Sequence, residues 1–201
     1  MDPLWLAGSI FLLTYAFIVS EKIHRTISAL LGGLAMILFV LPQEQAFHSI
    51  DWNVIFLLAG MMIIANVLKE TGVFQWIAIK AVRLGKGDPF RVLILLSLIT
   101  AVSSALLDNV TTVILIAPVT LFVASTLRVS PIPFLIAEIL ASNIGGMATL
   151  IGDPPNILIG SAANIDFVSF LVNMGPISLI ILLAFLGLAR FLFKKELTVQ
   201  D

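Results

Sequence analysis

The sequence predicts an all-α protein that crosses a lipid bilayer several times. Hydrophobic residues occupy 60% of the 201 positions and charged residues 11%, whereas soluble domains are about 45–50% apolar and about 25% charged. Apolar segments recur along the whole chain, which excludes a soluble domain carrying a single anchor. The sequence contains no Cys, so disulfides and thiolate metal sites are excluded. The net charge of −1 gives no indication of a nucleic-acid partner.

A transmembrane helix needs about 20 apolar residues, and on this basis we expect five full spans, one of them broken. We also expect one re-entrant helical hairpin and one helix at the inner interface, all in a single membrane domain. The first segment lacks a basic start and a small-residue cleavage site, which favours a retained span over a signal peptide. The expected elements are scaffold helices in 4–68 (4–20, 27–41 and 54–68), the interfacial helix at 73–84, the hairpin at 92–127, the broken helix at 132–163 and the last span at 176–193.

The distribution of Lys and Arg predicts the orientation in the membrane. All of them fall on one side if the N-terminus lies outside and the C-terminus lies in the cytoplasm. The other connections, at 42–53 and 163–175, carry no Lys or Arg. We therefore expect an integral protein of the plasma (inner) membrane. The cations on the inner side are Lys22, Arg25, Lys69, Lys80, Arg83, Lys86, Arg91, Arg128, Arg190, Lys194 and Lys195.

The segment 92–127 is expected to enter the membrane from the cytoplasm and return. A single crossing would put Arg91 and Arg128 on opposite faces and break the charge pattern. Two complete spans would satisfy the pattern equally well. Each apolar arm falls short of a comfortable span, however, and the polar sequence at 108–112 joins them without a soluble loop. Length and this polar join favour two half-depth helices that meet at a tip.

Between the third span and the hairpin, Val73–Leu84 is apolar with Trp76, Lys80 and Arg83 near one side. This pattern predicts a helix at the inner interface, where Trp and cations lie at headgroup depth. A covered cytoplasmic helix is the alternative. Gly72 is placed to cap the preceding helix.

The first polar break, residues 108–112, interrupts the apolar hairpin segment. An acid at the centre of a membrane segment costs about 3 kcal/mol and usually faces a cavity. Asp108, Asn109, Thr111 and Thr112 supply oxygen atoms that suit Na⁺, or H⁺ on the acid itself. The free N–H groups of 113–115 could instead attract an anion. The alternative without a functional role is an N-cap, in which Asp108 or Asn109 only begins the next helix.

The second polar break, residues 142–156, lies within the predicted broken helix at 132–163. A glycine pair unwinds or thins a helix, and Pro154-Pro155 prevents helical hydrogen bonding beyond it. A close-packing glycine pair followed by an ordinary loop is the bland alternative. The combination of amides, glycines, a hydroxyl and an acid in so short a stretch favours a binding site. The candidate residues are Asn143, Gly145, Gly146, Thr149, Asp153 and Asn156.

Other polar residues receive more ordinary interpretations. Glu138, near the inner end of its span, could reach the cytoplasm, pair with Arg128 or gate a cavity, and the first two are favoured. His24 and His48 are isolated and lack ligand spacing, so no metal centre is expected. Asp108 and Asp153 could form an intramembrane aspartyl-protease dyad, but Leu150 replaces the glycine of that signature and the Pro-Pro pair is foreign to it. No catalytic residue is therefore assigned.

The two polar breaks resemble the paired signatures of the ion transporter superfamily. They are most similar to the arsenite-permease and NhaD-type Na⁺/H⁺ antiporter branch, which includes the melanosomal P protein and carries a citrate-transporter-like domain. The segments 60–64 and 70–74 also resemble that branch, and the likeness covers most of residues 23–165. The resemblance implies an elevator-type secondary transporter, usually a homodimer. The helices at 4–68 would form its scaffold, and the hairpin, broken helix and last span its moving part.

The resemblance also implies which residues form the site. In sodium-coupled dicarboxylate relatives the hairpin tip is Ser-Asn-Thr, whereas Asp108, Asn109 and Val110 stand here. Asp153 likewise replaces a common Thr. These differences favour cation or proton coupling over a carboxylate substrate. The residues implied by matching positions are Asn109, Thr112, Asn143, Gly145, Gly146 and Thr149, and Na⁺ is expected at Asn109, Thr112, Asn143 and Thr149.

Members of the superfamily typically carry two inverted repeats, and this sequence contains one. We expect the first repeat of a transporter for an ion or small anion, by Na⁺/H⁺ exchange or by arsenite or anion efflux. A missing C-terminal repeat or a second half-chain would complete it, and a homo-oligomer is expected. Two identical copies would need dual topology, which the charge bias opposes. A non-transporting assembly subunit is the alternative. Besides the bilayer and the substrate, only Na⁺ or H⁺ is expected as a coupling ion, with no other cofactor.

Overall fold

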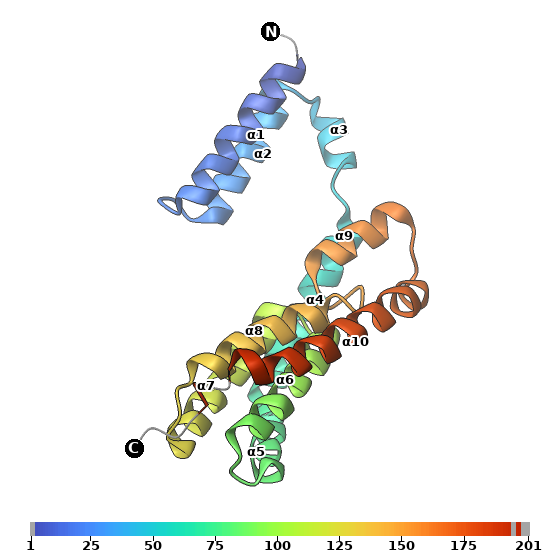
Figure 1. Ribbon diagram of the computed structural model, residues 1–201. Coiled ribbons are helices and arrows are strands. Elements are labelled where there is room, and N and C mark those ends of the chain that lie inside the picture. The colour runs from blue at the N-terminus through green and yellow to red at the C-terminus, as the bar shows by residue number, and fades with distance from the viewer. Residues whose placement is uncertain (1–2, 194–195, 198–201) are drawn as a thin grey trace. The chain divides into compact units, whose positions relative to one another are not determined.

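The computed structural model describes residues 3–193 and 196–197, which form ten α-helices (Figure 1). Ala78 and Ala81 are described by their backbone alone, and the predicted inner cations Lys194 and Lys195 lie outside the described residues. The chain divides into two compact units, Met1–Asn53 and Val54–Asp201. Each unit is treated by itself below.

The first unit contains α1 (Pro3–Ser20), α2 (Arg25–Phe39) and α3 (Gln43–His48). α1 and α2 pack side by side (Figure 1), and a side chain at Gly32 of α2 would collide with Thr14 of α1. The glycine therefore allows close approach of the two helices. α3 lies where the sequence analysis placed only a connection. Ala46 of α3 is buried. A helix of only six residues is easily missed when helices are predicted from sequence patterns.

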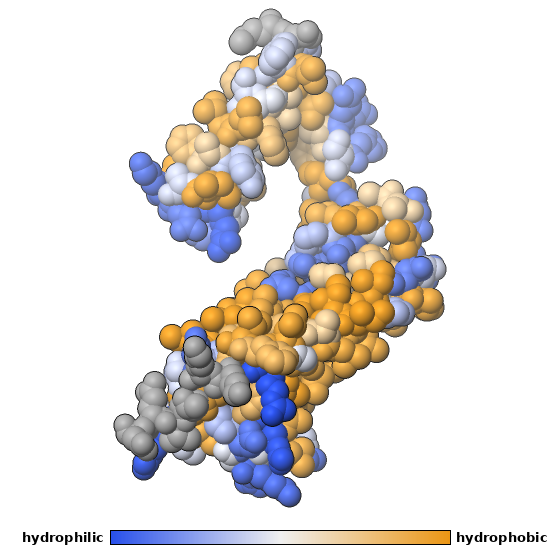
Figure 2. Space-filling model, in the orientation of Figure 1, coloured by the Kyte–Doolittle hydropathy of each residue, from blue (hydrophilic) through white to orange (hydrophobic). Residues whose placement is uncertain are grey.

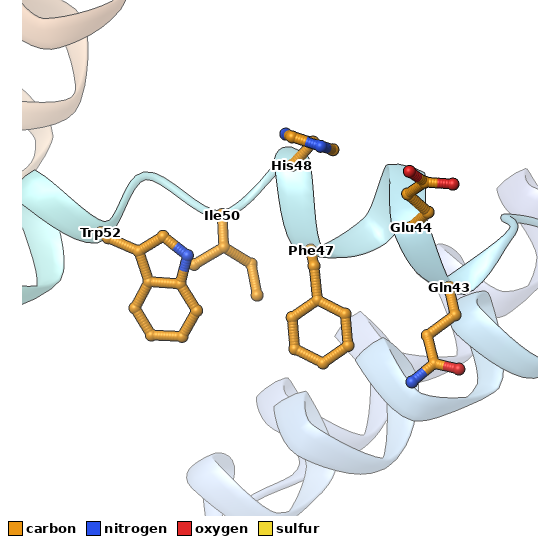
Figure 3. Close-up of a pocket in the computed structure, with 6 residues that line it drawn as sticks. All are labelled: Gln43, Glu44, Phe47, His48, Ile50 and Trp52. Atoms are coloured by element: carbon orange, nitrogen blue, oxygen red, sulfur yellow. The ribbon is translucent and has the colours of Figure 1, made fainter.

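A cavity of about 740 Å³ lies between α3 and the segment that follows it. Phe47, Ile50 and Trp52 point to one side of the chain there, whereas Glu44 and His48 point to the other (Figure 3). The cavity contains neither polar break. Its lining combines aromatic and polar residues, which agrees with the composition of a membrane–water interface.

The second unit holds both polar breaks. Its core lies where α6 packs on α8, with α7 and α10 also against α8 (Figure 1). Buried side chains such as Leu93, Leu96 and Phe134 fill that interface. Its helices are α4 (Trp52–Glu70), α5 (Val73–Gly85), α6 (Pro89–Leu106), α7 (Asn109–Leu127), α8 (Ile132–Gly146), α9 (Pro154–Ala163) and α10 (Phe167–Leu192).

Five of the described helices are long and apolar enough to cross a membrane, namely α1, α4, α6, α7 and α10. The all-α, polytopic class is therefore confirmed. The set of five differs from the predicted one, because α2 and α8 have only 15 residues each. The two arms of the predicted hairpin, α6 and α7, have 18 and 19 residues. Each arm is therefore long enough to cross the membrane, and helix length alone does not favour a hairpin over two spans.

The last helix begins earlier than predicted. α10 starts at Phe167, whereas the sequence analysis began the last span at residue 176. Asp166 caps it by accepting hydrogen bonds from the backbone N–H groups of Val168 and Ser169, both at 3.0 Å. Pro176 was treated as a boundary, but it lies inside the helix. Membrane helices tolerate such prolines.

The surface of the second unit is that of an integral membrane protein. Large hydrophobic side chains stay exposed, including Phe191 at 80% and Phe122 at 68%. Hydrophobic residues cover most of the visible face over α8 and α10, and hydrophilic ones gather around α5 (Figure 2). A helix that exposes this much apolar surface needs lipid or another apolar partner around it.

α5 forms at the predicted position and packs on α6 and α7. Phe74 is buried, whereas Trp76 is exposed and has the Lys80 ammonium 4.8 Å from its ring centre. Gly72 adopts the left-handed conformation expected at a helix junction. The assignment of α5 to the inner interface stays a prediction.

Candidate functional site

The candidate site begins with the close contact between α6 and α8. A side chain at Gly145 would overlap the backbone of Ala101 on α6. Gly145 is itself fully enclosed in α8. Helices that approach to backbone contact need glycine at the crossing. The first residue of the glycine pair therefore fixes how closely α6 and α8 pack.

Two serine side chains hold the C-terminal half of α8. The Ser104 hydroxyl on α6 donates to the backbone carbonyl of Ser142 at 2.7 Å. From the other side, the Ser178 hydroxyl on α10 donates to the carbonyl of Ile144. Ile144 is among the last four residues of α8, whose carbonyl groups have no intrahelical partner. The end of α8 is thus fixed between α6 and α10.

The second polar break is an ordered non-helical segment between α8 and α9. Thr149 donates its hydroxyl to the carbonyl of Ala105 at 2.6 Å and accepts the N–H of Gly152 at 3.0 Å. The Asn156 amide donates to the carbonyls of Gly146 at 3.1 Å and of Thr149 at 3.0 Å. These side chains satisfy backbone groups that lipid could not. The sequence therefore carries its own hydrogen-bond partners for the break.

Gly146 and Gly152 face each other across this break. A side chain at either glycine would collide with the backbone of the other or with Ser104. The chain thus folds back on itself at the point where α8 ends. α9 begins at Pro154, and the Asp153 side chain before it does not cap the helix.

The first polar break lies at the start of α7. Asp108 accepts a hydrogen bond from the N–H of Thr111 at 2.8 Å and is the N-cap of the helix. Asp108 therefore begins α7 as an N-cap, as the alternative interpretation predicted. The Asn109 amide donates to the side-chain oxygen of Asn143 on α8 at 3.1 Å. The two polar breaks, far apart in sequence, thus meet through their asparagines.

The two acids of the breaks lie near enough to interact electrostatically, Asp108 with Asp153. Neither forms an ion pair with a residue of the described part of the chain. A pair of neighbouring carboxylates without a cationic side chain attracts a cation or a proton.

An open groove of about 240 Å³ lies at the contact between the two breaks. Its walls come from the first two turns of α7 and the last turns of α8. Two amides and a serine are its polar groups, and the rest of the lining is apolar. The residues are Asn109, Val110, Val113, Ile114, Ile139, Ser142 and Asn143.

The two threonines of the first break do not line this groove. Thr112 is fully buried, and its hydroxyl oxygen has no partner among the described residues. Thr111 instead lines a second cavity, of about 160 Å³, together with Asn66 and Lys69 of α4. Sequence analysis did not single out Asn66. The sequence feature that could have identified Asn66 is its amide side chain within the apolar segment 54–68.

Glu138 lies elsewhere than predicted. It was expected to reach the cytoplasm or to pair with Arg128, but it is fully buried and forms no ion pair with a described residue. The Thr120 hydroxyl of α7 donates to its Oε1. The prediction was wrong because the side chain points toward α7, an orientation that the distance to a helix end does not reveal.

The chain is similar to known membrane proteins. A family model described as citrate transporter matches residues 15–201. A 46 kDa membrane protein of Mycobacterium leprae is 48% identical over 200 residues, which cover 97% of this chain and 47% of that protein. An uncharacterized transporter of Mycobacterium tuberculosis is 50% identical over 201 residues, 98% of this chain and 47% of the relative. The human P protein is 41% identical over 199 residues, 94% of this chain and 24% of that protein. The chain spans about half the length of the mycobacterial relatives.

Proposed function

This chain belongs to the citrate transporter family, and from that premise we propose that it is one repeat of a secondary-active membrane transporter. It moves an ion or a small anion by alternating access. The conclusion rests on the contact between Asn109 and Asn143, which joins the two polar breaks at the groove. Transporters of many folds place substrate and coupling ions where interrupted helices meet near the bilayer midplane.

A re-entrant hairpin made of α6 and α7 is part of the proposal. α6 has 18 residues and α8 has 15, or about 27 Å and about 22 Å of helix. The contact between Ala101 and Gly145 puts the end of α6 level with the break that follows α8. α9 extends beyond that break. If α8 and α9 together cross the bilayer, the tip of the hairpin lies inside it.

The charges of the site support a cation or proton as the coupling ion. Asp108 and Asp153 interact electrostatically without a cationic partner in the described chain. Asn109, Asn143 and Thr112 add amide and hydroxyl oxygens, which are suitable ligands for Na⁺. Arsenite or anion efflux receives less support, because the Asp108 carboxylate already occupies the Thr111 N–H at the start of α7.

The contacts suggest different roles for the residues of the second break. Thr149 and Asn156 stabilise the break through backbone carbonyls, and Gly145 and Gly146 permit its close packing. Asn143 lines the groove, and Asp153, whose side chain does not cap α9, is left to bind the ion. In this proposal the first group holds the site and the second group binds.

A complete transporter needs a second repeat with its own hairpin and broken helix. We propose that the repeat comes from further sequence of the same polypeptide or from a partner chain, in a homo-oligomeric assembly. An assembly subunit that does not transport is the second candidate. Purification from membranes with a chain that carries the second repeat would favour the transporter.

The proposal is tested by the substitution Asp108→Asn in proteoliposomes. The full protein, with its second repeat, is reconstituted with a pH-sensitive dye inside, and a Na⁺ or pH gradient is imposed. We expect ion-coupled flux to fall to the level of empty vesicles while the protein still elutes as a single folded species. Asp166→Asn, an exposed acid at the start of α10, is the matched control and keeps its flux. Unchanged flux in Asp108→Asn would rule the assignment out.

A further inference from the structure

The structure contains a buried acid that the proposed site does not use. Glu138 lies in the second turn of α8 and is completely enclosed. Its Oε1 accepts a hydrogen bond from the Thr120 hydroxyl of α7. Its Oε2 is also buried and has no hydrogen-bond partner among the described residues. We propose that Glu138 is a proton-binding site, a neutral carboxylic acid enclosed between the hairpin helix α7 and the broken helix α8.

Among the described residues, the helices packed against α8 bring no charge that pairs with Glu138. α8 packs on α6, α7 and α10, and Glu138 is the only ionisable residue within α8. α6 contributes Arg91, which lies 3.6 Å from its own partner Asp88 and is largely exposed. α10 contributes Arg190, whose guanidinium lies over the Phe90 ring. Asp108 and Arg128 are at the two caps of α7, and no ionisable residue lies between them.

Burial of an unpaired carboxylate is costly, and such a group binds a proton instead. A neutral acid also agrees with the observed hydrogen bond. Thr120 donates to one oxygen, which therefore acts as the carbonyl oxygen, and the proton belongs to Oε2. The binding step is a single proton added to the Oε2 of the carboxylate and lost from it again to water, without any other reactant.

A second unpaired group lies on α6, which packs against α8. α6 and α8 run in parallel, with Ser104 of α6 bonded to Ser142 of α8. Ser97 lies seven residues before Ser104 on α6, and Glu138 lies four residues before Ser142 on α8. The Ser97 hydroxyl is likewise fully buried without a partner among the described residues. Both helices of this interface thus carry a buried oxygen without a partner among the described residues.

The position of the acid gives the proton a route of release. Pro118 lies in α7 just before Thr120 and removes one backbone hydrogen bond from the helix there. A movement of α7 away from α8 would break the Thr120 contact and admit water to Glu138. The link between this movement and transport rests on the proposed function, whereas the proton site itself does not.

Infrared spectroscopy of the protein in vesicles of phosphatidylethanolamine and phosphatidylglycerol tests the site directly. At neutral pH we expect the carbonyl stretch of a protonated carboxylic acid, shifted by exchange into D₂O. The band is expected to vanish in Glu138→Gln and to persist in Asp108→Asn and Asp153→Asn. A band that survives in Glu138→Gln, or that is absent from the unmodified protein, would overturn the proposal.

A second variant protects the test against a folding failure of Glu138→Gln. Thr120→Val keeps the acid and removes the hydroxyl that donates to it. The same band should stay and move to higher frequency, because its carbonyl oxygen loses a hydrogen bond. An unmoved band would show that this acid is not the origin of the signal.

The transport assay separates this proposal from the proposed function. We expect Glu138→Gln to lose the dependence of flux on pH while a Na⁺ gradient still drives exchange of substrate. If Asp108→Asn abolishes flux but Glu138→Gln leaves the pH profile unchanged, the coupling role of Glu138 fails and the transporter assignment stands. If neither protein transports, the infrared band still decides whether the proton site exists.

Discussion

The side-chain amide of Asn109 donates to the side-chain oxygen of Asn143 across 3.1 Å, joining the first turn of α7 to the last turns of α8. The two residues are 34 positions apart in the chain, so this bond depends on the tertiary arrangement. It also closes one wall of the groove. A hydrogen bond between side chains of different membrane helices contributes about 0.6 kcal/mol on average and at most about 1.7 kcal/mol.

The Asn109–Asn143 bond is testable by a double-mutant cycle. Asn109→Ala and Asn143→Ala should each lower the free energy of unfolding in a titration with sodium dodecyl sulfate. The double variant should lose less than the sum, with a coupling of about 0.5–1.5 kcal/mol. Asn173 of α10 bonds only to its own helix in the described contacts, so Asn109→Ala with Asn173→Ala is the control and should be additive. Additivity in the test pair would mean that the bond does not form in the membrane.

Gly145 should tolerate no larger side chain. Gly145→Ala places a methyl group against the backbone of Ala101, and a forced fit in a packed interface costs about 1–3 kcal/mol. Gly187 is also helical, but a side chain there meets nothing within 4 Å. Gly187→Ala is therefore the matched control and should stabilise its helix by up to about 1 kcal/mol. Thermal unfolding in detergent measures both, and an equal effect of the two changes would contradict the close contact.

The sequence explains why the two polar breaks turn away from lipid. Acids, amides and glycines inside apolar segments cannot be left facing lipid, so both breaks had to turn toward protein or water, and they meet at Asn109 and Asn143. The all-α class followed from composition in the same way. Both conclusions follow from the cost of placing polar groups in lipid, and that cost can be judged from the residue types in the sequence.

The failures concern properties that depend on tertiary contacts. The direction of Glu138 is determined by Thr120 on another helix, and α10 extends through Pro176 because Asp166 begins it earlier. The cavity beside Thr111 involves Asn66, a residue from a helix that the sequence treated as scaffold. A single sequence reveals that a residue is polar and buried, but which neighbour satisfies it comes only with the packing.

Thr149 should be more important for stability than its single hydroxyl suggests. Its hydroxyl donates to Ala105 and accepts from Gly152, and the residue is 4% exposed. Thr149→Val keeps the shape but leaves both backbone groups without partners, which costs about 1–3 kcal/mol each time a buried group is left unpaired. Thr149→Ser should restore most of the loss. Thr126→Val, at an exposed hydroxyl that bonds within its own helix, is the control. A serine variant as unstable as the valine variant would remove the hydrogen bonds as the cause.

Asp166 provides a pH-dependent test at the exposed start of α10. The Ser169 hydroxyl at 2.5 Å, followed by the Ser169 backbone N–H, lowers the pKa of this carboxyl below its ordinary value. A lowered pKa means that the cap stabilises the helix above the ordinary pKa of Asp and that this contribution is lost as pH falls through the pKa of the folded state. Ser169→Ala should therefore raise the pKa of Asp166. Carboxyl ¹³C titration, with Asp166→Asn to assign the signal, measures the change. An unshifted titration would contradict the hydroxyl contact.

The re-entrant hairpin is testable because the sequence contains no Cys, so a single introduced thiol can be labelled without background. If α6 and α7 were two full spans, Val110 would emerge at the outer surface. In a hairpin that enters from the cytoplasm it stays at membrane depth, although 64% of its surface is exposed in the isolated chain. Val110→Cys should then resist a bulky, membrane-impermeant maleimide from outside.

Two reference positions make that result interpretable. Ala162→Cys, an exposed position near the end of α9, should react from outside, and Arg128→Cys, at the end of α7, only after the membrane is opened. The positive-inside pattern requires Arg128 to be cytoplasmic in either topology, so this position verifies the orientation and Val110 alone distinguishes the topologies. Fast labelling of Val110→Cys from outside, at the rate of Ala162→Cys, would establish two full spans and put the contact between Asn109 and Asn143 at the outer surface. Slow labelling at Val110 by the bulky reagent, together with fast reaction by a small one that follows the groove, is the result expected of an aqueous site inside the bilayer.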